Sequence, residues 1–265
     1  MSRFMLLQSF DNKKAVEPLI VSTKSLFERC GLSYEVSFDM ASDGGYWAGL
    51  ANSDLFAYAN AKNMALSEAK GATLLALNQK SYDGVLRARE MLSGDAKLLD
   101  RVQLALRGIG LEYHPNSRIA LFDDLLGAHQ EKVAEGSLSG LAIALCGKAD
   151  SHCMQMLLKS GVRLSLVQKA TDYYRLVDFD KKLATKGAAQ DYFACVDSGV
   201  DCIATDCVDT FALFDLHIKA LNKASKRDRA DTPTLYLSQL LLLAMGERDA
   251  NKIGFSHHTV RPSFV

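Results

Sequence analysis

The stretch Asp197-Ser198-Gly199-Val200-Asp201-Cys202-Ile203-Ala204-Thr205 indicates how the chain folds. A helical pattern over about Leu183–Ser198 ends before Gly199, a residue that enters the left-handed conformation at little cost and so closes a helix. The apolar residues after this glycine have the length and composition of a short buried strand. We therefore expect a helix, a glycine cap and a strand in direct succession.

The same order recurs in the N-terminal half of the chain. Ala69-Lys70-Gly71-Ala72 ends a predicted helix over Asp54–Ala69 and precedes a predicted strand over Thr73–Leu77. The spacing of roughly 130 residues between the two pieces exceeds the 20–50 residues of solenoid repeats, so it indicates a domain duplication. We expect a first repeat over residues 1–135 and a second over residues 136–265.

Strands and helices alternate in both predicted repeats. Because each helical crossover returns the chain to the same end of a sheet, this alternation predicts an α/β protein with two tandem repeats, each a mainly parallel sheet flanked by helices. The further strands are expected over residues 4–7, 32–38, 141–145, 162–167 and 200–205, and the further helices over about 14–30, 82–92, 151–159 and 208–222. Sites in such sheets lie beyond the carboxyl ends of the strands.

The amino-acid composition argues against several classes of function. Lysine plus arginine and aspartate plus glutamate number 31 each, so no net field would draw the chain to nucleic acid or to an anionic membrane. The strongest apolar run, Leu235–Met245, is too short to span a bilayer and is interpreted as a buried helix. No export signal is visible, and six cysteines in 265 residues are too sparse for a secreted disulfide framework. We expect a cytoplasmic protein with reduced cysteines.

The C-terminal phrase Thr232-Pro233-Thr234-Leu235-Tyr236-Leu237-Ser238-Gln239-Leu240, continued by Ala244-Met245-Gly246, carries a family resemblance. Weaker support comes from Asn63–Leu66, from Ser81-Tyr82 and from Leu138–Leu141. On these residues the chain resembles, over nearly its whole length, the cysteine-rich CCG family typified by the B-type subunit of heterodisulfide reductase. The resemblance implies relatives in fumarate or succinate reductases and in glycolate or lactate oxidation complexes.

The resemblance also implies a set of ligand positions. Each family repeat supplies a lone cysteine, a Cys-Cys-Gly turn and a Cys-x-x-Cys pair that together hold an iron–sulfur cluster able to cleave a disulfide. The first repeat here has Ser9 at the lone position, Asp43-Gly44 near the turn, and Asn78 and Ser81 at the pair. The second repeat has Cys146 at the lone position, Thr171-Asp172 near the turn, and Cys207 and Thr210 at the pair.

Most of these positions have lost their sulfur. Iron–sulfur clusters need several thiolates, typically four, and hydroxyl or amide side chains are poor replacements. We therefore expect no cluster, no other cofactor and no metal site. The positions expected to line the vacated clefts are Ser9, Gly44, Asn78, Ser81, Tyr82, Thr171, Asp172, Asp206 and Thr210.

Three functions remain open from the sequence. The leading hypothesis is a cluster-free binding or assembly partner of other redox-complex subunits, such as an iron–sulfur protein or a flavoprotein, without a membrane span of its own. The second is a thiol–disulfide or electron-transfer subunit that uses Cys146 and Cys207 as redox thiols, so whether the chain is an enzyme stays open. The third is a small-molecule binding protein that has reused the clefts.

The remaining candidate side chains favour structural roles. Cys195 and Cys202 follow apolar helix and strand patterns, where cysteine packs as a small hydrophobic residue. Asp206 is a candidate N-cap for the helix after it. His257 and His258 are adjacent and should point to opposite sides, so a shared metal is not expected and a surface or capping position is favoured for both.

Overall fold

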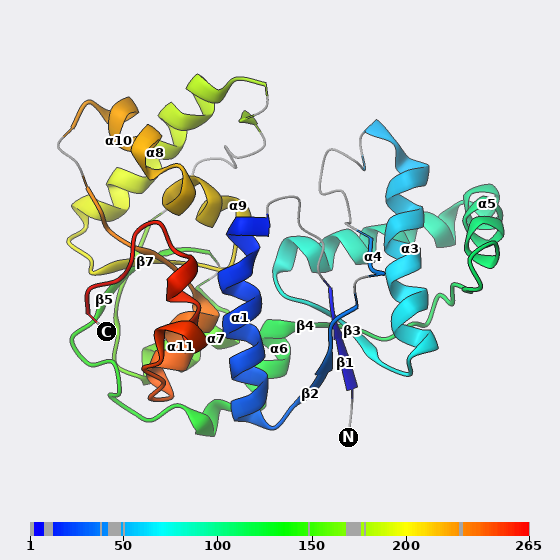
Figure 1. The fold of residues 1–265 in the computed structure, drawn as a ribbon, viewed down its shortest axis with the longest axis horizontal. Coiled ribbons are helices and arrows are strands. Elements are labelled where there is room, and N and C mark those ends of the chain that lie inside the picture. The colour runs from blue at the N-terminus through cyan, green and yellow to red at the C-terminus, as the bar shows by residue number, and fades with distance from the viewer. Residues whose placement is uncertain are drawn as a thin grey trace. The chain divides into compact units, whose positions relative to one another are not determined.

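The computed structural model describes residues 3–7, 13–37, 39–41, 49, 51–147, 149–167, 176–177, 179–227 and 230–264. The chain divides into two compact units. The first unit comprises Met1–Asp11 and Gly31–Ala128, and the second comprises Asn12–Cys30 and His129–Val265. Each unit has a four-stranded parallel sheet flanked by helices (Figure 1). This confirms the predicted fold class, whereas the boundary at 135/136 stays a prediction.

The first unit has the strand order β2-β1-β3-β4. Its buried core lies between β1 and β3 and the helices α3, α4 and α5, with Leu7, Met64, Leu74 and Val102 among its members. The elements are β1 (Arg3–Leu6), β2 (Ser33–Glu35), α3 (Ser53–Ala69), β3 (Thr73–Ala76), α4 (Gln79–Gly94), α5 (Ala96–Arg107), β4 (Ile119–Leu121) and α6 (Phe122–Gly127).

The second unit has the equivalent strand order β6-β5-β7-β8. Its core includes Tyr192, Cys195, Ile203 and Phe214, which pack between the sheet and the helices α8 and α10. The elements are α1 (Lys13–Cys30), β5 (Ala142–Cys146), α7 (His152–Lys159), β6 (Arg163–Leu166), α8 (Lys181–Asp197), β7 (Cys202–Thr205), α9 (Val208–Phe211), a π-helical turn (Ala212–Leu216), α10 (Ile218–Ser225), β8 (Thr234–Tyr236), α11 (Leu237–Ala244) and α12 (Ala250–Ile253), with short 3-10 turns at Gln130–Lys132 and Phe255–His257.

Helix α1 follows a strand of the first unit but packs in the second. Its apolar side, which includes Leu19 and Phe27, is buried, and it lies against α11 and α12. Polar contacts fix its position: the Tyr236 hydroxyl donates to the Ala15 carbonyl oxygen (2.7 Å), and the Ser22 and Ser238 hydroxyls lie 2.7 Å apart. The second unit is therefore completed by a segment from the N-terminal part of the chain.

The sequence patterns do not predict the fourth strand of either sheet. β4 runs directly into α6 and β8 runs directly into α11, with no intervening loop. The apolar run Leu235–Met245, interpreted as one buried helix, therefore begins as a strand and continues as α11. Within the described part of the chain, no helix combines the length and apolar character needed to cross a membrane.

Candidate functional site

The carboxyl end of the second unit's sheet aligns three side chains in one row. The parallel registers pair Cys146 of β5 with Thr205 of β7, and Thr205 with Tyr236 of β8. Thr205 Oγ1 donates a hydrogen bond to the Cys146 carbonyl oxygen (3.1 Å) and accepts one from the Cys207 amide (3.0 Å). All three row residues are buried. The threonine hydroxyl therefore ties together the main chain at both candidate redox thiols.

The sulfur that contacts Cys146 belongs to Cys195. The two Sγ atoms lie 3.6 Å apart, and the residues are 4% and 0% exposed. The contact with the Cys146 thiol, burial and the nearby Asp191 carboxylate all raise the pKa of the Cys195 thiol. Because a cysteine reacts as its thiolate, Cys195 is a weak nucleophile at neutral pH.

Cys207 has a more open position. It is half-buried at the N-cap of α9, where its side chain makes no capping hydrogen bond. A pairing of Cys146 with Cys207 stays a prediction. Cys195 and Cys202, which are expected in the core, are both buried there, but the contact between Cys195 and Cys146 is not predictable from the sequence patterns.

The residues around Cys207 are closely packed. A Cβ atom added to Gly147 would lie 3.1 Å from Asp206 Oδ1, so the glycine leaves room for this carboxylate. The N-cap of α9 is Cys207, one residue after the expected Asp206. Thr210, a predicted cleft-lining residue, is buried in α9.

The equivalent row in the first unit is apolar. The registers pair Leu6 with Leu75 and Ala76 with Leu121, and the Leu7 amide donates to the Leu75 carbonyl oxygen. Continuing this register by one residue places Leu7 opposite Ala76, in the positions that Cys146 and Thr205 hold in the second unit. Leu7 precedes the predicted lone position, Ser9, by two residues. The edge of this sheet therefore offers no sulfur ligand in the aligned row.

The predicted pair position of the first unit caps a helix. Asn78 is the N-cap of α4, and its Oδ1 accepts a hydrogen bond from the Ser81 amide (2.9 Å). Both residues are buried, and Tyr82 packs partly buried against the core. The Asn78 side chain thus satisfies a free amide of the helix N-terminus. The remaining predicted positions, Ser9, Gly44, Thr171 and Asp172, lie outside the described residues.

A buried polar network in the second unit is missing from the sequence-based prediction. Gln239 Oε1 accepts the Tyr236 amide (2.9 Å), which directs its Nε2 to the Ile253 carbonyl oxygen (2.9 Å) and to His258 Nε2 (2.9 Å). His258 Nε2 must therefore accept, so the proton of the neutral ring is on Nδ1, 3.7 Å from Asp215 Oδ1.

Burial dominates the titration of this network. It lowers the pKa of His258 to about 3 and raises the pKa of Asp215, whose carboxylate accepts the Thr259 and Val260 amides. His257, by contrast, is partly exposed beside Glu17. The two histidines do have different surroundings, but the expectation of a surface position is wrong for His258.

These residues do not fit a family-type iron–sulfur cluster. The described aligned positions supply Cys146 and Cys207 in the second unit and no cysteine in the first, whereas a cluster typically takes four thiolates. No group of three or more potential metal ligands occurs among the described residues. The chemistry that the described site can support is that of thiols in a packed sheet edge.

The chain is similar to a known protein family over part of its length and to a solved structure over all of it. Residues 173–259 match the model of the HdrB-like C-terminal domain. A crystal structure of a hypothetical protein from Helicobacter pylori is similar over 100% of this chain and 53% of that chain, with a TM-score of 0.89 and 22% sequence identity. The chain thus spans about half the length of that neighbour, and the likeness concerns the fold.

A weaker structural match is GanP, a glucose-galactose binding protein from Geobacillus stearothermophilus. It has 11% identity over 89% of this chain and 77% of that chain, but its TM-score of 0.25 is too low to indicate a shared fold. No curated protein matches the sequence significantly.

Proposed function

We propose that this chain, whose residues 173–259 match the HdrB-like C-terminal domain, acts as a cluster-free binding or assembly component of a redox complex. The family match supports a redox-related role within a complex of several subunits. The partners would be the other subunits of such a complex, iron–sulfur proteins or flavoproteins.

The observation that supports the proposal is that the described positions at which the family resemblance implies ligands serve the fold. In the first unit, Asn78 caps α4 by accepting the Ser81 amide, and both residues are buried. In the second, Cys146 contacts a buried thiol and Thr210 is buried. Side chains engaged in caps and cores stabilise a scaffold, and a scaffold without a reactive centre can still hold partner subunits together.

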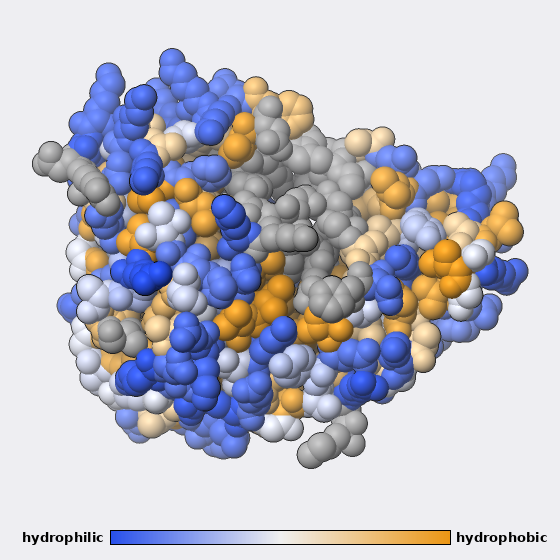
Figure 2. Space-filling view, in the orientation of Figure 1, coloured by the Kyte–Doolittle hydropathy of each residue, from blue (hydrophilic) through white to orange (hydrophobic). Residues whose placement is uncertain are grey.

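The second unit also has a surface suited to a charged partner. Six exposed lysines lie on or beside α8 and α10, which pack against each other, and Figure 2 shows hydrophilic residues over this region. None of the six forms an ion pair with a described residue, whereas Asp197 is paired with Arg227 (2.6 Å). We call Lys181, Lys182, Lys186, Lys219, Lys223 and Lys226 the lysine surface.

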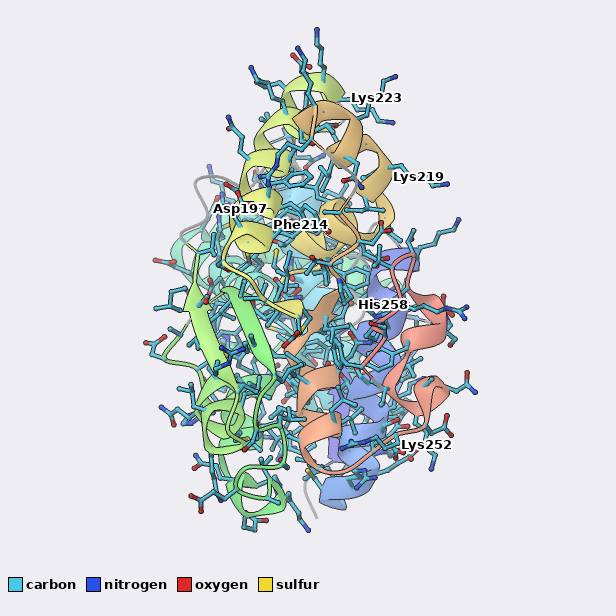
Figure 3. All side chains as sticks on the ribbon, turned by 90° about the vertical axis from the view of Figure 1, so that its left-hand side faces the viewer. Asp197, Phe214, Lys219, Lys223, Lys252 and His258 are labelled. Carbon is cyan, nitrogen blue, oxygen red and sulfur yellow. The ribbon has the colours of Figure 1, made fainter. Side chains whose placement is uncertain are left out.

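An acidic surface on a partner protein complements this arrangement. Opposite charges at an interface steer the encounter and favour one partner over others. The chain as a whole is neutral, so the concentration of lysines on two helices is a local feature. Figure 3 shows Lys219 and Lys223 extending outward from α10, while Lys252 lies on a separate part of the second unit.

The test is isolation of the native complex with a tagged full-length chain. We expect the wild-type chain to co-purify with iron–sulfur or flavin-containing proteins, identified by mass spectrometry and by their absorption spectra. The double variant Lys219→Glu, Lys223→Glu should lower the yield of these proteins at least about tenfold. Attraction between opposite charges raises association rates by factors of about 10 or more, and the charge reversal turns this attraction into repulsion. The matched control, Lys24→Glu with Lys252→Glu, should retain them.

Two results would contradict the proposal. If the wild-type chain is recovered without any iron–sulfur protein or flavoprotein, the assembly role fails. If both double variants retain the partners equally, the partners bind elsewhere and the role of the lysine surface fails. Circular dichroism of each variant verifies that the fold is retained.

A further inference from the structure

The contact between Cys146 and Cys195 joins two elements that are distant in the sequence. Cys146 ends strand β5, and Cys195 lies in the last turn of α8. Their sulfurs are 3.6 Å apart, so a bond of about 2.05 Å needs a closure of only about 1.5 Å. Helix ends fray more readily than helix centres, so the last turn of α8 is a place where such a closure is feasible.

The pair is a particular feature of the second unit. In the first unit, Leu7 takes the position of Cys146. Ser67, which precedes Gly71 by the same four residues that separate Cys195 from Gly199, takes the position of Cys195. Ser67 donates its hydroxyl to the Met64 carbonyl oxygen (2.8 Å), a local contact within its own helix. The two facing sulfurs therefore occur in only one of the two equivalent positions.

The pair is linked to a more accessible thiol through the main chain. The Cys146 carbonyl oxygen accepts the Thr205 hydroxyl, and this hydroxyl accepts the Cys207 amide. A main-chain movement of Cys146 that accompanies bond formation would alter the first of these hydrogen bonds. Half-buried Cys207, at the start of α9, is therefore placed to report the state of the pair.

We propose that Cys146 and Cys195 are a redox modification site, converted to a disulfide by a small hydroperoxide such as hydrogen peroxide. One thiol loses its proton and its sulfur attacks a peroxide oxygen, which breaks the O–O bond and gives a sulfenic acid and water. The second thiol then attacks that sulfur, forms the S–S bond and releases a second water. The two thiols lose two electrons and two protons in total, and the peroxide is reduced to two waters.

The burial of the pair selects the oxidant. A small uncharged peroxide can reach the sulfurs during local opening of the α8 terminus, whereas a bulky disulfide such as oxidised glutathione needs a much larger opening. The raised pKa of Cys195 means that the reaction is slow compared with that of an activated thiol. The site responds to sustained oxidation and does not turn over as a catalyst. This inference is independent of the proposed assembly role.

The test is treatment of the folded, reduced full-length chain with hydrogen peroxide, followed by alkylation and non-reducing peptide mass spectrometry. We expect a peptide pair linked through Cys146 and Cys195 and a changed rate of Cys207 alkylation. Cys195→Ser should abolish both effects. Cys202→Ser, which removes another buried cysteine, should leave both unchanged.

Two results would overturn the proposal. One is a disulfide between Cys146 and Cys207 instead of one between Cys146 and Cys195. The other is oxidation of the half-buried Cys30 and Cys207 while Cys146 and Cys195 remain reduced. Cys146→Ala provides a second variant if Cys195→Ser fails to fold, since it should abolish the same linked peptide. Either variant that still yields a linkage at the remaining cysteine of the pair would count against the assignment.

Discussion

Replacing His258 with glutamine is expected to remove a specific part of the pH dependence of folding. The His258 side chain is completely buried, packs edge-on against the rings of Phe211 and Phe255, and accepts a hydrogen bond from Gln239 Nε2. A second proton on the ring would place an N–H opposite the Gln239 amide group, which is itself fixed by its bonds to Tyr236 and Ile253. The folded protein therefore resists protonation of His258.

The direction and size of the effect follow from linkage. The pKa of His258 is about 3 in the folded chain, against an ordinary value of 6.5. As the pH falls below 6.5, the unfolded chain binds this proton and the folded chain does not, so the stability that is present above pH 6.5 is progressively lost. Between pH 7.5 and pH 5.5 the loss is about 1.4 kcal/mol. Asp215, whose pKa is raised by burial, has the opposite effect, because the folded chain binds its proton more readily than the unfolded chain does.

The assay is urea unfolding of the wild type and His258→Gln at pH 7.5, 6.5 and 5.5. We expect the variant to be less stable at pH 7.5 but to lose about 1.4 kcal/mol less than the wild type on acidification to pH 5.5. Comparing the two proteins cancels the titration of those groups whose surroundings the substitution leaves unchanged. Equal losses in wild type and variant would refute the reasoning.

Two further substitutions test the local structure. Asn78→Ala should destabilise the chain by about 1 kcal/mol, because it removes the side chain that caps α4. Asn78→Ser, which keeps a capping oxygen, should retain most of the stability. Equal melting temperatures for the wild type and the alanine variant would contradict the capping role. Gly254→Ala should be more destabilising than Gly246→Ala: both glycines have positive φ, which costs about 1–2 kcal/mol for alanine, but only at Gly254 would the new Cβ lie 3.0 Å from the Pro18 carbonyl oxygen of α1. Equal decreases in melting temperature for the two variants would show that Gly254 does not lie close to the Pro18 carbonyl oxygen.

The alternation of strands and helices could be predicted from the sequence because each element has its own signal. Gly31, Gly71 and Gly199 all have positive φ, as their predicted positions after helices require. The strands β4 and β8 lack such a signal, since each is three residues long and runs into a helix without a turn residue. The apolar pattern across each junction therefore resembles a single helix.

The candidate site was less predictable because it depends on contacts between distant elements. Cys146 and Cys207 stand out in the sequence at strand ends, but Cys195 has the pattern of a core residue of α8, and only the packing of α8 on β5 brings its sulfur to Cys146. The position of His258 depends in the same way on Gln239, nineteen residues earlier. The packing of α1 in the second unit has no local signal either, because its amphipathic pattern would suit either sheet.

The central claim is that hydroxyl, amide and apolar side chains have replaced the thiolates of an iron–sulfur site. It is tested most directly by the iron content of the full-length chain, purified without oxygen and incubated with ferrous iron, sulfide and a thiol reductant before desalting. We predict a colourless protein that retains far less than one iron per chain. Several irons per chain with a brown colour, lost in Cys146→Ala, would contradict the account.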